Sequence, residues 1–327
     1  MIIQNKIFLR KKRNFSEMFN TVFALVRANF RVIAGALLMV GGPFILLTGV
    51  VTGILQSTVL RSIKDFSEAM FRDGVSQYLS DMISGYAGWF LVTWLFSLLA
   101  FSFIRATMAN FFILYDSKSE GDDLTSAEIA SKSFRDGFRI FGGVLLLSVV
   151  SFIPLAIIIG LVALLASTGG IAATVILIFV LVLLLLAFGP QLTYIFSFAS
   201  WFAMLRDKVS IFRAIGNTFR TIRGNFWWIW VLMVCMFFIV SILNYVTSLP
   251  ATIYYQVSIF TRSGLDGGDI SYVYVLLFVI AQFGAHLFQC LGDLLVCVSY
   301  FSFEEERTGN GLQTRIDEIG LETEIKE

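Results

Sequence analysis

Charged residues, histidine and the short motifs of common enzymes are scarce or missing in this sequence. Charged residues make up 14% of the 327 residues, whereas they make up about 25% of an ordinary soluble domain. The sequence has one histidine, His286, so it cannot build a metal cluster from several histidines. It also lacks the GxxxxGK[ST], HExxH and GxSxG patterns that mark P-loop hydrolases, zinc proteases and serine hydrolases. We therefore expect a protein that is not an enzyme, with no catalytic residues, no metal and no cofactor.

Cysteine and proline are scarce as well. The three cysteines, Cys235, Cys290 and Cys297, all lie within apolar runs, so we expect neither a disulfide nor a CxxC metal or redox site. We interpret them as small apolar residues. Only four prolines occur, which suits long helices. Pro154 and Pro190 lie inside apolar runs and should bend their helices, because proline cannot donate a backbone hydrogen bond.

Hydrophobic residues, by contrast, make up 57% of the chain and gather in long runs. About 20 apolar residues in an α-helix are needed to cross ~30 Å of hydrocarbon. Six runs reach that length, so the sequence predicts an all-α polytopic membrane protein that forms one membrane domain over residues 1–327. The predicted spans are Val32–Gln56, Ala87–Tyr115, Phe141–Ser167, Ile171–Leu205, Phe226–Leu249 and Ser271–Phe301.

The basic residues predict the orientation of these spans. Of the 24 Lys and Arg residues, only four lie on one side, and these are Arg61, Lys64, Arg72 and Arg262. All the others lie on the opposite side, with Arg105 counted near the inner end of the second span. In membrane proteins the cytoplasmic loops carry the excess of Lys and Arg. Both termini are therefore expected in the cytoplasm, with residues 304–327 as an acidic cytoplasmic tail.

The sequence also contains an internal repeat. Phe23–Phe30 aligns with Phe219–Phe226 at a constant offset of 196, and Phe134–Phe141 is a weaker copy. Each copy precedes an odd-numbered span and has apolar residues at spacings of three and four. The pattern predicts an interfacial helix followed by a two-span hairpin, used three times. The three units cover approximately residues 15–115, 124–205 and 209–303.

Basic residues occupy the other face of these amphipathic segments. Arg27, Arg31, Arg220 and Arg223 are expected in the headgroup layer, where they would meet anionic lipid. The helices could form a collar that docks partner proteins or senses lipids. They could instead only set the angle at which the next span enters the membrane, and the pattern leaves both interpretations open.

The ends of two even-numbered spans align too. Tyr115–Gly121 parallels Phe303–Gly309 at an offset of 188. The same register places Arg105 opposite Asp293. Both would lie at a similar depth near the inner interface, so we expect them to form an ion pair. Such a pair is usually structural.

The sixth predicted span carries a polar stripe. Gln282, His286, Gln289 and Asp293 are spaced by 4, 3 and 4 residues. At 3.6 residues per turn these four side chains share one face of a helix. Ionisable groups inside a span are costly, which makes the stripe a candidate functional site.

Three interpretations of the stripe stay open. It could line a solvated path or substrate cavity in which His286 and Asp293 carry protons. Its side chains could instead form hydrogen bonds between helices, with Arg105, Thr193 and Tyr194 facing them. Asp293 could also lie close enough to the cytoplasmic surface to be hydrated.

The segment Phe219–Trp228 and the exit Ser299–Gly309 resemble a group of bacterial multi-pass membrane families of unknown function. The group includes the membrane domain that accompanies some glycerophosphodiester phosphodiesterases. The catalytic domain of those enzymes is missing here, so their activity is not carried over. The resemblance implies a location in the bacterial cytoplasmic (inner) membrane and a non-enzymatic, accessory role.

Together these patterns favour a scaffold or accessory subunit. It would engage membrane lipids and partner proteins, and not nucleic acid, through its basic cytoplasmic helices and its acidic tail. The first alternative is a transporter or lipid-handling protein whose path follows the polar stripe of the sixth span. The second is a permease-like subunit that depends on an ATPase from another chain.

Overall fold

A computed structural model of the chain describes residues 6–56, 75–119, 122–168, 170–261 and 272–309. The regular secondary structure of these residues is helical. Its elements are α1 (Phe15–Val40), a short apolar helix at Gly42–Gln56, α3 (Val75–Ser117), α4 (Ser126–Thr168), α5 (Gly170–Tyr194), the π-helix η1 (Ile195–Ala199), α6 (Ser200–Asp207), α7 (Ile211–Ile222), α8 (Phe226–Thr261) and α9 (Tyr272–Thr308). Among the described residues, six helical stretches are long and apolar enough to cross a membrane. This confirms the predicted all-helical fold with six spans.

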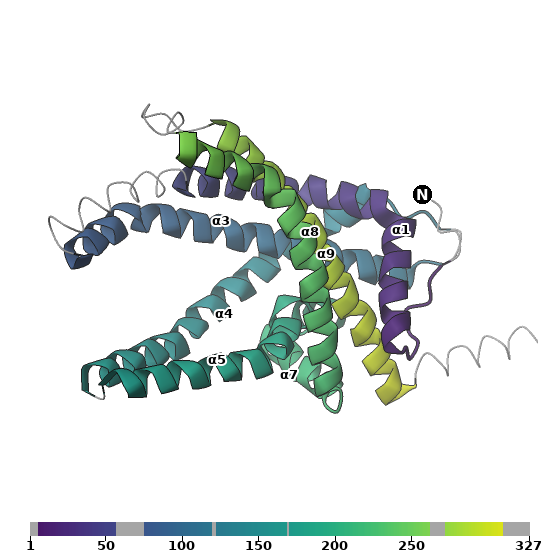
Figure 1. Cartoon of the computed structure of the whole chain (residues 1–327). Coiled ribbons are helices and arrows are strands. Elements are labelled where there is room, and N and C mark those ends of the chain that lie inside the picture. The colour runs from purple at the N-terminus through teal and green to yellow at the C-terminus, as the bar shows by residue number, and fades with distance from the viewer. Residues whose placement is uncertain (1–5, 57–74, 120–121, 169, 262–271, 310–327) are drawn as a thin grey trace, which may run out of the picture.

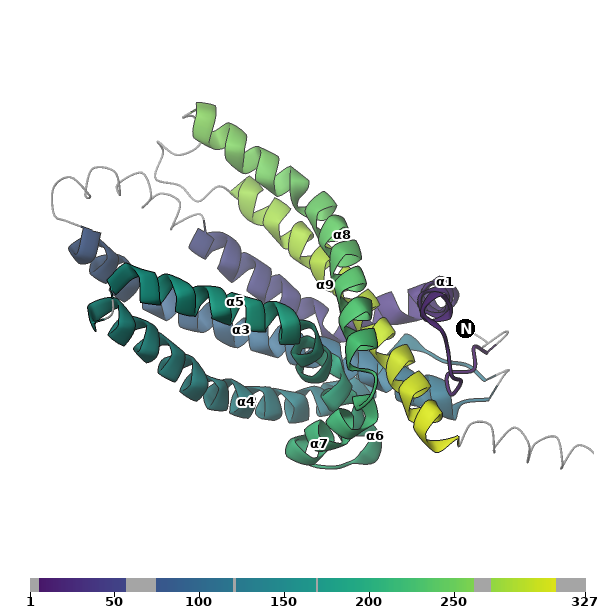
Figure 2. The ribbon, with the colours of Figure 1, turned by 60° about the horizontal axis from the view of Figure 1, so that its bottom comes forward.

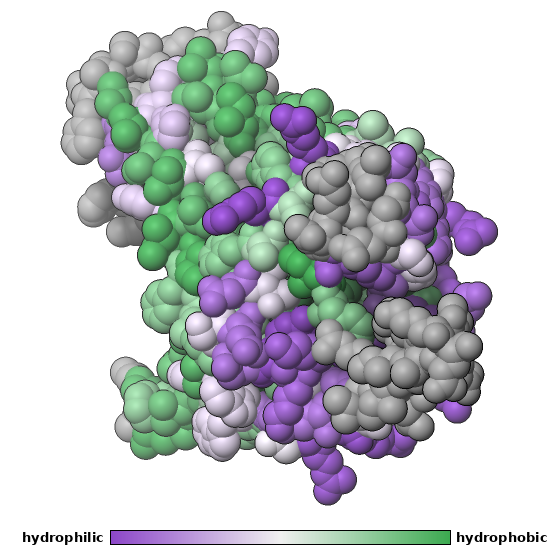
Figure 3. Space-filling model, turned by 90° about the vertical axis from the view of Figure 1, so that its right-hand side faces the viewer, coloured by the Kyte–Doolittle hydropathy of each residue, from purple (hydrophilic) through white to green (hydrophobic). Residues whose placement is uncertain are grey.

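The helices converge at one end of the molecule and spread apart toward the other (Figure 1). α4 and α5 lie side by side as one hairpin, and α8 and α9 lie side by side as another (Figure 2). α3 contacts α4, but the two helices diverge toward the left of Figure 1. We call the converging end, which holds the beginning of α1 and the last turns of α3, α6 and α9, the charged end. Hydrophilic residues cover much of it in Figure 3.

The buried core lies at the charged end. A series of aromatic rings connects three elements there, because Phe112 of α3 packs against Phe202 of α6, and Phe202 packs against Tyr300 of α9. All three side chains are buried. Away from this core the apolar side chains are exposed, and Leu185 of α5 has 69% of its surface accessible. Lipid as the surrounding solvent explains this exposure, since side chains that face hydrocarbon must be apolar.

The first predicted span, Val32–Gln56, has different bounds in the structure. α1 starts at Phe15, where Asn14 and Glu17 form a capping box, and it continues without a break into the predicted span. The helix then ends at Val40, and the chain makes a turn at Gly41 before the helix at Gly42–Gln56. Pro43 explains this break, because it has no backbone N–H to donate to the preceding turn.

The three predicted interfacial helices differ from one another. The first is the beginning of α1, and the second is the beginning of α4, so neither is separate from the helix that follows. The third is separate as α7, which ends before Gly224 with its φ of 102°. The repeat alignment places Ala28 and Arg139 at the position of Gly224. Residues with a Cβ disfavour positive φ, so Ala28 and Arg139 do not favour a turn at this position, whereas Gly224 does.

The fourth predicted span, Ile171–Leu205, is divided into three elements. Pro190 lies inside α5, and four residues after it the backbone passes into the π-helix η1 and then into α6. α6 lies out of line with α5 in Figure 2. Proline and π-turns both redirect helices, so the expected bend occurs just after Pro190. Trp201 stabilises it by donating a 2.8 Å hydrogen bond from its indole nitrogen to the carbonyl of Phe196.

Candidate functional site

Arg105 of α3 and Asp293 of α9 form a buried ion pair between the two helices. Nη1 of Arg105 donates to Oδ1 of Asp293. The two residues are only 3% and 1% exposed, respectively. The guanidinium carbon also lies 4.7 Å from the centre of the Phe101 ring. The structure therefore brings together the two residues that the repeat register paired, and it keeps Asp293 away from solvent.

This ion pair leaves hydrogen-bonding capacity unused. Among the described residues, neither Nε of Arg105 nor Oδ2 of Asp293 has a hydrogen-bond partner. A buried Arg–Asp pair joined by one hydrogen bond contributes less to stability than a bidentate pair, in which two parallel hydrogen bonds join the guanidinium and the carboxylate. Removal of either partner would still leave a buried charge uncompensated, which is strongly unfavourable. The pair thus couples α3 and α9 without being an optimal interaction.

The remaining residues of the polar stripe do not share one cavity. Gln282 lines a hollow between α8 and α9, whereas His286 lines another beside α1 and α3. The two hollows have no lining residue in common. Gln282, His286 and Gln289 are half-buried, and their side chains form no hydrogen bond with the described residues. The stripe therefore changes its surroundings along α9.

The fourth span contributes one of its two expected polar residues. The hydroxyl of Tyr194 lies 3.2 Å from the carbonyl oxygen of Val296, to which it donates, and 3.2 Å from the hydroxyl of Ser299. Tyr194 and Ser299 are buried. Thr193 was expected beside the stripe, but it is exposed instead. Its neighbour Tyr194 takes the buried position, because adjacent helical residues point about 100° apart.

A second, half-buried charge cluster was not predicted from the sequence. Arg206 of α6 forms two hydrogen bonds of 2.7 Å to the carboxylate of Glu304 in α9. Its guanidinium carbon lies 5.5 Å from the ring centre of Phe202 and 5.2 Å from that of Tyr300. The sequence placed Glu304 at the aligned end of the sixth span and in the acidic tail. Opposite charges at the same end of neighbouring spans are the signal that could have paired them.

The acidic residues assigned to the tail belong partly to the bundle. α9 continues to Thr308, so Glu304 and Glu306 lie in a helix. Glu306 binds Lys12 at 2.6 Å and accepts a 3.3 Å hydrogen bond from Asn225. These contacts connect the end of α9 to the chain before α1 and to the turn before α8. Residues 310–327 lie outside the described part of the chain.

The predicted interfacial basic residues form a different group. Arg27 and Arg31 of α1, Arg220 of α7 and Arg223 after it are all exposed. None of the four forms an ion pair or hydrogen bond with a described residue. Arg206, by contrast, is bonded to two acidic residues. Within the described part of the chain, the guanidinium groups of these four arginines are therefore not used in contacts with the protein.

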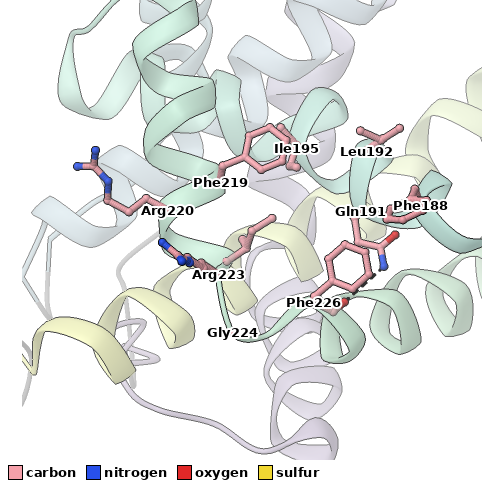
Figure 4. A pocket seen from close by; sticks show the side chains of 10 residues that line it. Phe188, Gln191, Leu192, Ile195, Phe219, Arg220, Arg223, Gly224 and Phe226 are labelled. Carbon is pink, nitrogen blue, oxygen red and sulfur yellow. Dashed lines mark hydrogen bonds between the residues drawn. The ribbon is translucent and has the colours of Figure 1, made fainter.

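A hollow of about 490 Å³ lies beside two of these arginines. Figure 4 shows aromatic and aliphatic side chains from α5, α7 and α8 around it, with the guanidinium groups of Arg220 and Arg223 extending from one edge. The lining residues are Phe188, Gln191, Leu192, Ile195, Phe219, Arg220, Ile222, Arg223, Gly224 and Phe226. The hollow thus combines an apolar interior with a cationic edge.

These features define an integral membrane protein with six helices that are long and apolar enough to cross a bilayer, and among the described residues its surface ion pairs gather at the charged end. Within the part of the chain that the structure describes, no three His, Cys, Asp or Glu side chains come close enough to hold a metal ion. Comparisons with protein-family models, with curated proteins and with solved structures found no match.

Proposed function

We propose that this protein is a non-enzymatic scaffold or accessory subunit of a bacterial cytoplasmic membrane. It has both termini in the cytoplasm and engages lipid headgroups and partner proteins through its charged end and the amphipathic segments beside it. The observation that carries the proposal is the contrast between two groups of basic residues. One group, represented by Arg206 and Lys12, is bonded to acids of α9. The other has no acidic partner among the described residues.

The basic residues without such partners stand among exposed aromatic side chains. Phe219 and Trp227 are exposed near Arg220 and Arg223 in the sequence, and Phe30 is exposed next to Arg31. Aromatic residues favour the boundary between hydrocarbon and water. Each Lys or Arg held near an anionic leaflet contributes about 1 kcal/mol of attraction. This combination supports contact with anionic headgroups.

A transporter or lipid-handling protein is the alternative, and one observation favours it. The hollow beside Gln282 measures about 490 Å³ and is lined largely by polar residues, including Asn244, Tyr255 and Tyr274. Oδ1 of Asn244 has no hydrogen-bond partner among the described residues. The separation of this hollow from the one beside His286 weakens the case for a continuous path, so we rank the alternative second.

Crosslinking in living cells tests the scaffold proposal. A photoreactive amino acid at Arg27 and, in a second variant, at Arg213 should capture the same partner protein, because both positions are exposed beside the charged end. A matched probe at Phe179, an exposed apolar position on α5, should capture lipid only. Failure of the first two positions to share a specific partner would refute the scaffold proposal. Loss of solute flux from vesicles in a stable His286→Ala variant would favour the transporter instead.

A further inference from the structure

The hollow beside Arg220 and Arg223 has the dimensions and lining of a lipid site. Its volume of about 490 Å³ falls within the range of about 300–1,000 Å³ that is usual for small-molecule pockets. Phe188 of α5 and Phe226 of α8 form one wall, with ring centres 5.8 Å apart. Phe219 of α7 stands on another side (Figure 4). An acyl chain would therefore contact apolar side chains from three elements.

The cationic edge of the hollow suits a phosphate. Arg220 lies in the last turn of α7, and Arg223 follows three residues later, just after the helix. Figure 4 shows both guanidinium groups projecting outward on the α7 side of the hollow, and both side chains are exposed. Neither is bonded to a described residue. None of the ten described residues that line the hollow is acidic. Guanidinium groups bind phosphate oxygens through paired hydrogen bonds, so a phosphate here would meet two donors and no competing carboxylate.

The hollow also lies at the level of the membrane expected for lipid headgroups. Phe226 is the first residue of α8, and the next two residues, Trp227 and Trp228, are 70% and 51% exposed. Exposed tryptophans at the start of a span mark the headgroup level of a bilayer. Gly224 leaves the edge open, since a Cβ placed there would meet nothing within 4 Å. The described side chains therefore do not close the hollow beside Gly224.

We propose that this hollow binds one anionic phospholipid, with its phosphate between Arg220 and Arg223 and an acyl chain along Phe188, Phe219 and Phe226. The inference rests on the headgroup contact in the proposed function and assigns that contact to one place. An anionic lipid is favoured over a zwitterionic one by charge complementarity. A choline or ethanolamine headgroup would bring a third cation beside the two guanidinium groups.

Photolabelling in nanodiscs tests this site. The full chain is reconstituted with phosphatidylglycerol that carries a diazirine near the end of one acyl chain, or with the matching phosphatidylcholine. Mass spectrometry then maps the label. We expect labelling of the segments around Phe188–Ile195 and Phe219–Phe226 with the anionic probe. Neutralising one arginine near an anionic surface should lower occupancy about fivefold, so R220Q/R223Q should lose nearly all of it.

Matched variants distinguish whether photolabelling depends on the two arginine charges, on the shape of the hollow or on correct folding. Arg213→Gln removes an exposed charge from the same helix without touching the hollow, and it should leave labelling unchanged. Leu192→Trp fills the hollow but keeps both arginines, and it should also abolish labelling. Should R220Q/R223Q fail to fold, the Leu192→Trp variant alone decides, because retained labelling in it overturns the proposal.

The remaining outcomes distinguish this inference from the proposed function. Equal labelling by the two lipids, or labelling that R220Q/R223Q leaves intact, overturns the lipid site. If the anionic probe labels only the region of Arg27 and Arg31, the assignment of the lipid site to this hollow is refuted, but the proposed contact with anionic headgroups stands. If no region prefers the anionic lipid, both fail. Excess inorganic phosphate at constant ionic strength should not compete, since it has no acyl chain. Competition would make this a phosphate site and overturn the lipid assignment.

Discussion

Removal of either partner of the Arg105–Asp293 ion pair should destabilise the protein more than removal of both. A buried ion pair that loses one member costs about 3–5 kcal/mol, because the remaining charge is uncompensated. Only Nη1 and Oδ1 are bonded, while Nε and Oδ2 have no partner among the described residues. We therefore expect the lower limit, about 3 kcal/mol, for Arg105→Met and for Asp293→Asn. The double variant should lie within about 1 kcal/mol of the natural sequence, since it buries no charge.

The assay is a double-mutant cycle measured by reversible unfolding in mixed micelles, with helical circular dichroism as the signal. The expected coupling energy between Arg105 and Asp293 is about 5 kcal/mol or more, because each single variant leaves one buried charge uncompensated and the double variant leaves none. Arg10 and Asp116 provide a matched control, since they form an ion pair at 2.8 Å with side chains 45% and 24% exposed. Their coupling should stay below about 1 kcal/mol. Additive effects at Arg105 and Asp293 would refute the reasoning.

Three further predictions follow from the packing and the topology. Gly137→Ala should destabilise the protein by about 1–3 kcal/mol, because the new Cβ would lie 2.5 Å from the ring of the buried Phe103. Gly142→Ala is the control: its new Cβ would meet nothing within 4 Å, so the thermal midpoint of unfolding should stay unchanged or rise. Gly224→Ala should cost about 1 kcal/mol because of its positive φ, and a midpoint equal to that of the natural sequence would contradict that strain. Reporter enzymes fused to each terminus should both be active on the cytoplasmic side, and opposite locations would disprove the predicted orientation.

The sequence predicted those features of the fold that depend mainly on the lipid environment. Lipid demands long apolar helices, so the number of spans could be predicted from composition and run length. The pairing of Arg105 with Asp293 was also accessible, because the repeat register placed the two residues at one depth. That register carries information about tertiary structure, which hydrophobicity alone does not.

Features that depend on local backbone competition or on the packing of distant elements were not accessible. The end of α1 at Val40 reflects Pro43, and the π-helix at Ile195–Ala199 reflects a change of helical register after Pro190. Hydrophobicity specifies neither feature, although Pro190 itself predicted a bend near the second one. The contact of Arg206 with Glu304 was missed because Glu304 was assigned to the acidic tail, whereas the aromatic rings of Phe202 and Tyr300 hold the pair at the helix ends.

The concentration of polar contacts at the charged end explains why the helices spread apart elsewhere. Within lipid there is no hydrophobic force that brings apolar helices together, so packing and interhelical hydrogen bonds must do so. In the described residues these bonds connect α3 to α9 through Arg105 and α6 to α9 through Arg206. Asn110 adds a 3.0 Å bond from α3 to Asp136 of α4. Toward the opposite end α3 and α4 present mainly apolar side chains, which gain as much from lipid as from each other. Their divergence in Figure 1 follows from that balance.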